Sequence, residues 1–398
     1  MKLVFSRAVM KKAIDICKDV AKDKLNTKIW VLTAGKGDIF LYTSRNKEVK
    51  YFHNLKAMVP IEEKISFLID PYTLDEALKG KEKMKEWGIS EDRKKLIVEK
   101  EITAKGSKEI TFETEEIDIQ WFEGKFPIDK MEFKEMNEPE EFLQMVETIK
   151  NVSGKTAVNF TMGGGEMTVR SPLYIKRFTL QEDLPSCTMP ITYLTLLKNN
   201  LLWRKTDKEK TLTYFGREGE LVLRTELCPK KPEDHIKQLF IFKQSKEQLN
   251  VKRIDGETVH TFTLQSDLIL SSLKQYKKPV VDVYMYDLNG QLCVDPYDKK
   301  GEPVEEDEDQ PIFLFDYNGN LKRTKVDLEG IISFLEGYQG EISVDIKKFV
   351  EDDEEYYLLS SKTSLFYSVL MAKKEPNYKK IQEKVDRILE EQKKIPYL

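Results

Sequence analysis

The sequence has little of what most enzymes and metalloproteins use for chemistry. It contains three histidines and four cysteines in 398 residues. No histidine stands at the spacing of a metalloprotease motif or a catalytic triad, and no two cysteines stand at metal-ligand spacing. The acidic residues are mixed with lysines, as on an ordinary solvated surface. We therefore place catalysis well below binding, expect no cofactor and no metal site, and interpret the cysteines as reduced thiols.

Long apolar segments are also missing. No run approaches the roughly 20 residues needed to cross a bilayer, and the N-terminal residues 1–15 carry charges where a signal peptide would be apolar. We therefore expect a cytoplasmic protein with no membrane partner. The formal net charge of −4 argues against a protein that is basic all over. It leaves open one whose 65 lysines and arginines gather on one surface.

What the sequence does have is a repeated supersecondary pattern. A β-type run precedes a polar residue and a short amphipathic helix, and several strands follow each helix. Six helices are predicted to begin near Ser6, Asp70, Asn137, Pro190, Ser266 and Asp327. A chain of this length exceeds what one core supports, and pairing the helices in order predicts an α+β protein of three domains. The boundaries are 1–129, 130–256 and 257–374, followed by a C-terminal helical extension at 375–398.

Several local features belong to this plan. The glycines within 34–38 and 163–165 are typical of hairpin turns that need positive φ, because neither stretch has the strand and helix that flank a phosphate loop. His53 and His260 fall in β-type runs, which favours structural roles. The acidic segment 299–310 is predicted to be a solvated insertion.

The last repeat carries a family resemblance. Asp327 is suited to cap a helix that ends at Gly337, and three β-type runs follow within 341–371. This order, together with MKLVFSRAVMKKAIDICKDVA at the N-terminus and the strand pair KIWVLTAGKGDIFLYTS, resembles the bacterial β sliding clamps, the ring-shaped processivity factors of DNA polymerases. The resemblance covers the chain up to Lys374, by pattern more than by fixed motif.

The resemblance implies a fold and partners. It implies the DNA-clamp fold, with two helix-plus-antiparallel-sheet units in each of three repeated domains. Two chains would close head to tail into a homodimeric ring around double-stranded DNA. The protein partners would be a DNA polymerase and a clamp loader. The divergence suggests a phage-encoded or otherwise atypical version.

Basic residues near the predicted helices are the candidate DNA contacts. On the first helix, at 100° per residue, Arg7, Lys11, Lys18 and Lys22 fall within about 60° of one another. Val9, Ala13, Ile16, Cys17, Val20 and Ala21 occupy the opposite side. The predicted DNA-binding residues are Arg7, Lys11, Lys18, Lys22, Lys79, Lys83, Lys198, Arg204, Lys205, Lys274, Lys277 and Lys278. The alternative is a set of ordinary exposed helix faces.

In the family, a groove between the second and third domains accepts short apolar peptides from partner proteins. By position, the matching residues here are Tyr174, Ile175, Arg177, Phe178, Val369, Leu370 and Met371. The alternative interpretation is ordinary strand core.

The leading functional hypothesis is a sliding clamp that encircles duplex DNA without sequence specificity and tethers a polymerase. The first alternative is a clamp-like scaffold that binds replication or repair proteins without encircling DNA. The second alternative is an enzyme acting on nucleic acid, which would need a carboxylate or histidine cluster that the sequence does not reveal.

Overall fold

The computed structural model describes residues 2–21, 29–34, 37–45, 48–59, 65–80, 82–91, 94–101, 107–113, 115–116, 131–155, 157–201, 210–217, 219–228, 235–244, 256–304, 311–351, 353–364 and 366–373. The expected domain junctions at 129 and 374 and the C-terminal extension 375–398 lie outside these residues. So do the candidate DNA contacts Lys22, Arg204 and Lys205.

The chain packs into two compact units. The first comprises Met1–Leu143, Met162–Gly164 and Glu182–Lys246, and the second Gln144–Thr161, Gly165–Gln181 and Glu247–Leu398.

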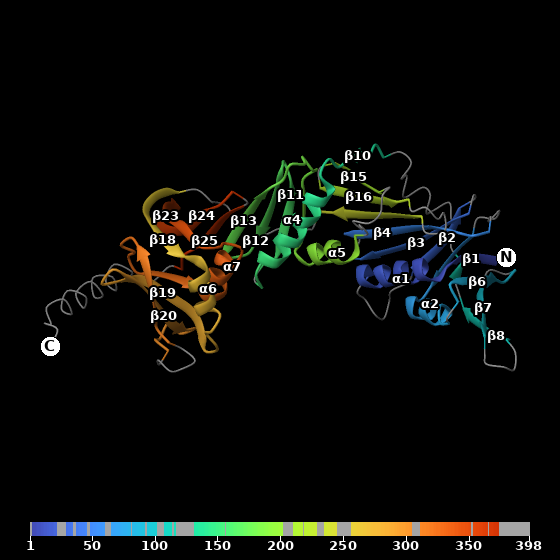
Figure 1. Cartoon of the computed structure of the whole chain (residues 1–398), viewed down its shortest axis with the longest axis horizontal. Helices are drawn as coiled ribbons and strands as arrows, with labels where there is room; N and C mark the ends of the chain where they lie inside the picture. Colours follow the sequence, from blue (N-terminus) through green and yellow to red (C-terminus); the bar gives the residue numbers. More distant parts are fainter. Residues whose placement is uncertain are drawn as a thin grey trace. The chain divides into compact units, whose positions relative to one another are not determined.

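Helices and antiparallel strands alternate along the described chain, which confirms the α+β class (Figure 1). The helices are α1 (Arg7–Ala21), α2 (Pro71–Ala77), α4 (Pro139–Val152), α5 (Thr192–Asn200), α6 (Ser266–Leu273) and α7 (Leu328–Leu335). The strands are β1 (Lys2–Ser6), β2 (Ile29–Ala34), β3 (Asp38–Arg45), β4 (Val49–Lys56), β5 (Ile65–Ile69), β6 (Met84–Ile89), β7 (Lys95–Glu101), β8 (Ser107–Glu113), β9 (Glu115–Glu116), β10 (Lys134–Glu135), β11 (Asn159–Gly163), β12 (Glu166–Arg170), β13 (Tyr174–Thr179), β14 (Cys187–Pro190), β15 (Lys210–Arg217), β16 (Glu220–Leu227), β17 (Ile236–Lys243), β18 (Glu257–Gln265), β19 (Val280–Leu288), β20 (Gln291–Asp298), β21 (Phe313–Asn318), β22 (Thr324–Asp327), β23 (Glu341–Glu351), β24 (Glu354–Lys362) and β25 (Phe366–Met371).

Helix starts agree well with the sequence-based expectation. The Asp70 carboxylate accepts hydrogen bonds from the backbone of Tyr72 and Thr73 at 2.8 and 3.0 Å, which caps α2. Asp327 caps α7 in the same way, accepting from the Gly330 N–H at 2.9 Å. Each cap satisfies backbone donors that the first helical turn leaves without partners.

Three helices are shorter than the sequence predicts, and one of them is α5, which ends at Asn200 although the pattern predicts a helix over 190–205. The sequence pattern predicts a helix over 70–84, but α2 ends at Ala77 and the chain reverses at Gly80, whose φ of +140° suits glycine. Lys83 therefore directly precedes β6 instead of lying on a helix. Likewise α6 ends at Leu273, so Lys277 and Lys278 follow the helix.

The first unit contains two sheets. One has the strand order β1-β6-β7-β8, and the other runs β10-β15-β16-β17-β4-β3-β2-β5-β9. Figure 1 shows α1 and α5 along the same face of the larger sheet. The buried side of α1, which includes Val9, Ala13, Ile16, Cys17 and Val20, packs on β3 and β4. This confirms the apolar face predicted for that helix.

The second unit is built around one continuous strand order, β12-β13-β25-β24-β23-β18-β21-β20-β19-β22. The three runs predicted within 341–371 are confirmed as β23, β24 and β25. Gly163, Gly164 and Gly165 all have positive φ at the turn between β11 and β12, as expected for a hairpin.

The repeats exchange their first strands. Each repeat is one strand, one helix and three strands, beginning at β1, β5, β10, β14, β18 or β22. The first strand of a repeat pairs with the second strand of its neighbour: β1 with β6, β5 with β2, β10 with β15, β22 with β19 and β18 with β23. Because of this exchange, two repeats share one pair of sheets.

Last strands join the repeat pairs. β4 pairs with β17 from Val49↔Phe242 to Leu55↔Ile236, and we call this pairing the first seam. β13 pairs with β25 from Tyr174↔Leu370 to Phe178↔Phe366, and we call this the second seam. The first seam lies wholly in the first unit and the second seam wholly in the second unit.

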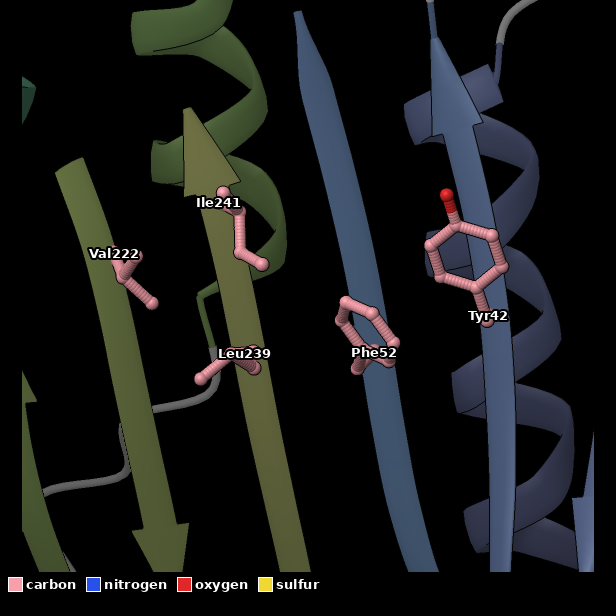
Figure 2. Packing of buried hydrophobic residues seen from close by; sticks show 5 residues of the cluster. All are labelled: Tyr42, Phe52, Val222, Leu239 and Ile241. Carbon is pink, nitrogen blue, oxygen red and sulfur yellow. The ribbon is translucent and has the colours of Figure 1, made fainter. Parts of the chain in front are cut away.

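An apolar cluster crosses the first seam. It comprises Tyr42, Phe52, Val222, Leu239 and Ile241. Figure 2 shows these side chains on the face of the strands turned away from the helices. All five are at most 6% exposed, so the outer face of this sheet has a core of its own.

Candidate nucleic-acid interface

Ion pairs connect the basic side of α1 to α2. Lys11 Nζ lies 2.6 Å from the Asp15 carboxylate and 3.0 Å from that of Asp75. Lys18 also forms an ion pair with Asp75, and its Nζ lies 4.9 Å from the centre of the Tyr72 ring. Burial is the main cause of a lowered pKa for Lys18, and the nearby Lys11 charge adds to it. Asp75 thus offsets part of the charge that this side of α1 would present to a phosphate backbone.

The other candidate DNA contacts differ in their hydrogen bonds, ion pairs and exposure. Arg7 is half-buried and donates to the carbonyl of Leu78 at 3.3 Å, and Lys79 pairs with Glu76. Lys274 pairs with Glu336 at 3.1 Å while remaining half exposed. The remaining described candidates are Lys83, Lys277 and Lys278, which are exposed, and Lys198, which is half-buried. The described basic residues therefore differ in how far solvent reaches them.

The first seam has a neutral hydrogen-bond network on its helix face. Gln238 donates to Tyr51 Oη at 2.9 Å and to the carbonyl of Asn200, at the end of α5, at 2.6 Å. Tyr51 Oη lies 2.7 Å from His53 Nδ1. Burial lowers the pKa of His53 to about 3, with a smaller contribution from Lys12. His53 is therefore a neutral structural residue, in agreement with the role expected for it.

The second seam has a buried amine at the equivalent place. Lys176 on β13 is fully buried, and its Nζ donates to the carbonyls of Val152 at 3.1 Å and Glu336 at 2.6 Å. Val152 is the last residue of α4 and Glu336 is the C-cap of α7. The amine therefore meets the partially negative ends of two helices. Burial lowers the pKa of Lys176 to about 7, and the charge of Glu336 opposes the shift.

The seven predicted groove residues lie on the two strands of the second seam but do not share one face. Successive residues of a strand point to opposite sides. Val369 and Met371 pack with the cluster around Phe349 and Leu358, whereas Leu370 lies against Gly330 of α7. On β13, Phe178 packs on Phe366 at 5.3 Å between ring centres. By alternation, Ile175 and Arg177 share the face of Val369, while Tyr174, Lys176 and Phe178 share that of Leu370.

Exposure separates the seven further. Tyr174, Ile175, Phe178, Val369 and Leu370 are buried, whereas Arg177 and Met371 are half-buried. A groove at this seam would therefore use mainly the half-buried side chains on the face of Val369.

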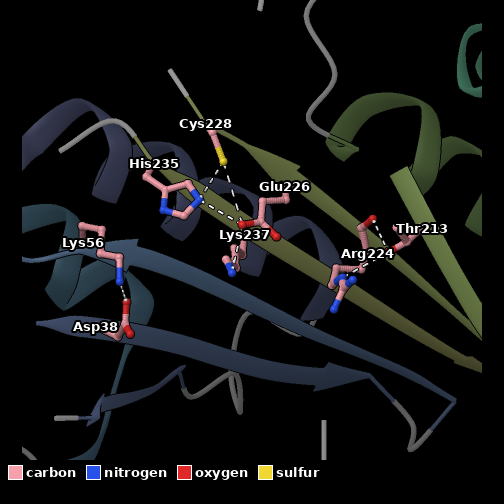
Figure 3. Close-up of polar contacts among 8 residues, drawn as sticks. All are labelled: Asp38, Lys56, Thr213, Arg224, Glu226, Cys228, His235 and Lys237. Carbon is pink, nitrogen blue, oxygen red and sulfur yellow. Dashed lines mark hydrogen bonds and ion pairs between the residues drawn. The ribbon is translucent and has the colours of Figure 1, made fainter. Parts of the chain in front are cut away.

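One cluster escaped the sequence analysis. Glu226, Cys228 and His235 place one carboxylate oxygen, one sulfur and one imidazole nitrogen within 4.8 Å of one another (Figure 3). Cys228 and His235 are separated by six residues, which is not a spacing of known zinc motifs. The cluster forms because β16 and β17 are an antiparallel pair whose register brings these positions together.

Among the described residues, no helix is both long enough and apolar enough to cross a membrane.

Comparisons with known proteins bear on the fold. No family model matches the sequence, and no curated protein matches it. Solved structures do match. The DNA polymerase III subunit beta of Pseudomonas aeruginosa superposes with a TM-score of 0.64 at 10% identity. The Helicobacter pylori beta clamp, solved with a DNA ligase peptide, gives 0.63 at 11%, and the Borrelia burgdorferi subunit beta gives 0.64 at 12%.

Each of these matches covers 94% of this chain and 100% of the other chain. The agreement therefore spans the whole architecture and not one repeat. The chain has the fold of the bacterial DNA polymerase III beta subunits, the sliding clamps.

Proposed function

We propose that this protein is a sliding clamp: a ring that encircles duplex DNA and tethers a DNA polymerase as its processivity factor. The observation that carries the proposal is the match to clamp structures across the full length of those chains. The chain then comprises three clamp domains, 1–129, 130–256 and 257–374, each formed by two repeats. It acts in the cytoplasm as a binding protein, and the chemistry belongs to the polymerase.

Binding without sequence preference suits the candidate DNA contacts. Lysines and arginines that meet phosphates give affinity for any sequence, because every base pair presents the same backbone charge. Lys83, Lys277 and Lys278 are exposed and carry this role in the proposal. Replacing both Lys277 and Lys278 by alanine should weaken binding to all duplexes alike. It should also flatten the salt dependence by about one unit of slope for each phosphate that no longer meets a lysine.

The strand order supports ring closure. Both seams join last strands of repeats, which leaves β8 and β21 as the remaining last strands. In the described residues, β8 ends its sheet and pairs with β7, and β21 meets β18 at only two positions. Next to this edge, Ile312 and Leu314 are 40% and 49% exposed. We assign the contact between two copies to β8 of one chain and β21 of the other, head to tail, as a homodimer.

The protein partners in this proposal dock at the second seam. A short apolar peptide from the polymerase or from a clamp loader would lie on the face that carries Ile175, Val369 and Met371, with Arg177 at its side. The half-buried rings of Tyr356 and Tyr367 pack on the same apolar cluster and extend that surface. An Arg177→Ala variant should weaken binding of such a peptide without changing the oligomeric state.

Negative-stain imaging of the purified chain tests the proposal directly. We expect closed rings whose hole admits duplex DNA, and a mass by light scattering of twice the 46.6 kDa chain. Leu314→Lys should turn the rings into single crescents by placing a charge beside the β21 edge. Val350→Lys is the matched control, because Val350 is 51% exposed on β23 and away from that edge. Crescents in the unmodified protein would overturn encirclement.

A scaffold that does not encircle DNA is the second candidate. It is favoured by the ion pairs of Lys11 and Lys18 with Asp75, which reduce the charge of α1, and by the acidic first turn of α4 with Glu140 and Glu141. The two functions differ in DNA topology. A ring stays on a closed circle and slides off the ends when the circle is cut, whereas a scaffold responds equally to both forms.

A further inference from the structure

We propose that Glu226, Cys228 and His235 form a binding site for one zinc-class divalent cation, at the end of the β16–β17 hairpin where the chain connects the two strands. Nothing in this inference depends on the proposed clamp function.

The geometry is close to that of a metal site. Cys228 Sγ lies 3.2 Å from His235 Nε2 and 3.9 Å from Glu226 Oε1, and the last two atoms are 3.2 Å apart. A tetrahedral zinc ion with ordinary bond lengths holds such donor atoms about 3.4–3.6 Å apart. Entry of the ion therefore requires movements of a few tenths of an ångström, which side-chain rotations can supply.

The backbone holds the three ligands in place. In the β16–β17 register, Glu226 is opposite Lys237 and Leu227 is opposite Ile236. Cys228 and His235 therefore stand at the next opposed position, and Glu226 points to the same face two residues before Cys228. Glu226 lies on β16, Cys228 directly follows that strand and His235 directly precedes β17, so two hydrogen-bonded strands hold the backbone of the ligands close together.

The donor chemistry favours zinc over calcium or magnesium. A thiolate and an imidazole are ligands for zinc and related transition metals, whereas the alkaline-earth ions prefer oxygen. When the Cys228 thiol gives its proton to solvent, one thiolate and one carboxylate balance the two charges of the ion. His235 binds as the neutral imidazole, and three protein ligands leave a fourth position for a water molecule.

Lysine side chains next to the site repel a bound metal ion. A similar glutamate–lysine pair on the same hairpin provides a control. Lys237 Nζ lies 2.9 Å from the same Glu226 oxygen, and Lys56 on β4 forms an ion pair with Asp38 close by (Figure 3). When one oxygen of the Glu226 carboxylate binds the ion, its second oxygen can keep Lys237 as an outer partner.

The test uses cobalt as a coloured substitute for zinc. The full-length chain is stripped of metal with a chelator, kept reduced with a phosphine, and titrated with Co²⁺. We expect a thiolate-to-cobalt charge-transfer band that saturates at one equivalent per chain and disappears when Zn²⁺ is added. Absence of the band in the intact protein would overturn the site.

Variants of the three ligands show which residues bind the cobalt that gives the charge-transfer band. Cys228→Ser should abolish it, and His235→Gln should weaken cobalt binding by more than the 10–100-fold, approximately, that removal of an outer partner costs. Glu226→Gln should weaken binding, whereas Glu220→Gln should not. Glu220 lies on the same face of β16 and also has a lysine neighbour, Lys243 at 3.8 Å, which makes it the matched control.

Two further measurements separate a loss of metal binding from a loss of folding and from the clamp function. Circular dichroism without metal should be the same for all four variants, and His235→Gln serves in place of Cys228→Ser if the latter does not fold. A band that persists in Cys228→Ser would assign the cobalt to another cysteine and overturn the proposal. Ring imaging of Glu226→Gln should match that of the unmodified chain, so failure of the metal site would leave the clamp proposal untouched.

Discussion

The two seams join strands of the same kind in the same antiparallel way, yet their chemistry differs. On the helix face of the first seam, Tyr51, His53 and Gln238 form a neutral network. At the second seam, the amine of Lys176 bridges the ends of α4 and α7. The first arrangement needs only hydrogen-bond partners, whereas the second also removes a charge from water, which is costly. The same architectural joint can therefore be built so that its stability rises with pH in different windows, between about 3 and 6.5 at the first seam and between about 7 and 10.5 at the second.

The largest expected effect comes from removing a ring at the first seam. Phe240 is fully buried, with ring centres 4.7 Å from Tyr51 and 5.8 Å from Phe242. Phe240→Ala should lower the free energy of unfolding by about 3–5 kcal/mol, measured by urea titration, because it leaves a cavity. Phe178→Ala is the matched change at the second seam.

Amide exchange then shows whether the seams are independent. Phe240→Ala should speed exchange in β4 and β17, and Phe178→Ala should speed it in β13 and β25. Equal acceleration in all four strands with either variant would mean that the two seams open together.

Acid should weaken the first seam. The folded pKa of His53 is about 3, below the value of 6.5 in an unfolded chain, so its stabilising contribution is present above pH 6.5 and is lost as the pH falls toward 3. Relative to His53→Gln, the protein should lose about 2 kcal/mol between pH 7 and pH 5. His260→Gln, at a half-buried strand position, is the control. A pH-independent difference between the protein and His53→Gln would contradict the neutral network.

Alkali should strengthen the second seam. The folded pKa of Lys176 is about 7, against 10.5 in an unfolded chain, so the unfolded chain binds the extra proton between these values. Stability should therefore rise with pH across that window, by about 2 kcal/mol between pH 8 and pH 10 relative to Lys176→Met. Urea titrations of both proteins at several pH values give the difference. A falling difference would mean that the helix ends hold the amine in its charged form.

An effect of comparable or smaller size should come from the turn beside Lys176. Gly337 has φ +92°, and a Cβ there would lie 2.7 Å from Val152 Cγ1 and 3.2 Å from the ring of Phe366. Gly337→Ala should cost about 1–3 kcal/mol through backbone strain and crowding. Gly290 also has positive φ, but a Cβ there would meet nothing within 4 Å. The loss of stability in Gly290→Ala therefore measures the cost of backbone strain alone. Equal losses in thermal unfolding would exclude a contribution from crowding.

Local features can be predicted from the sequence, and long-range ones cannot. Asp327 and the glycines of 163–165 indicate a cap and a turn through neighbouring residues alone. The predicted helix of 70–84 is too long because its lysines continue a helical pattern past Gly80. Lys176 stands within an ordinary strand pattern, LYIKRF, and no local signal tells that it is buried between two helix ends.

In the candidate sites too, local features can be predicted from the sequence and long-range ones cannot. Helical spacing predicts the apolar and basic sides of α1, but the position of Asp75 beside Lys11 and Lys18 depends on how α2 packs. The trio of Glu226, Cys228 and His235 depends on the register of a hairpin, which spacing along the chain does not encode. The full-length resemblance to clamps is visible in the sequence because it rests on the order of elements.

The second seam can form only late in the synthesis of the chain. Its strand β25 closes the described chain, while its partner β13 lies before the middle of the sequence. At the usual 5–20 residues per second, the ribosome takes roughly ten seconds or longer to supply the missing strand. During that interval the edge of β13 is a template for any extended segment nearby. Nascent chains should therefore depend on chaperones during this interval, before the full-length protein can protect its own edge.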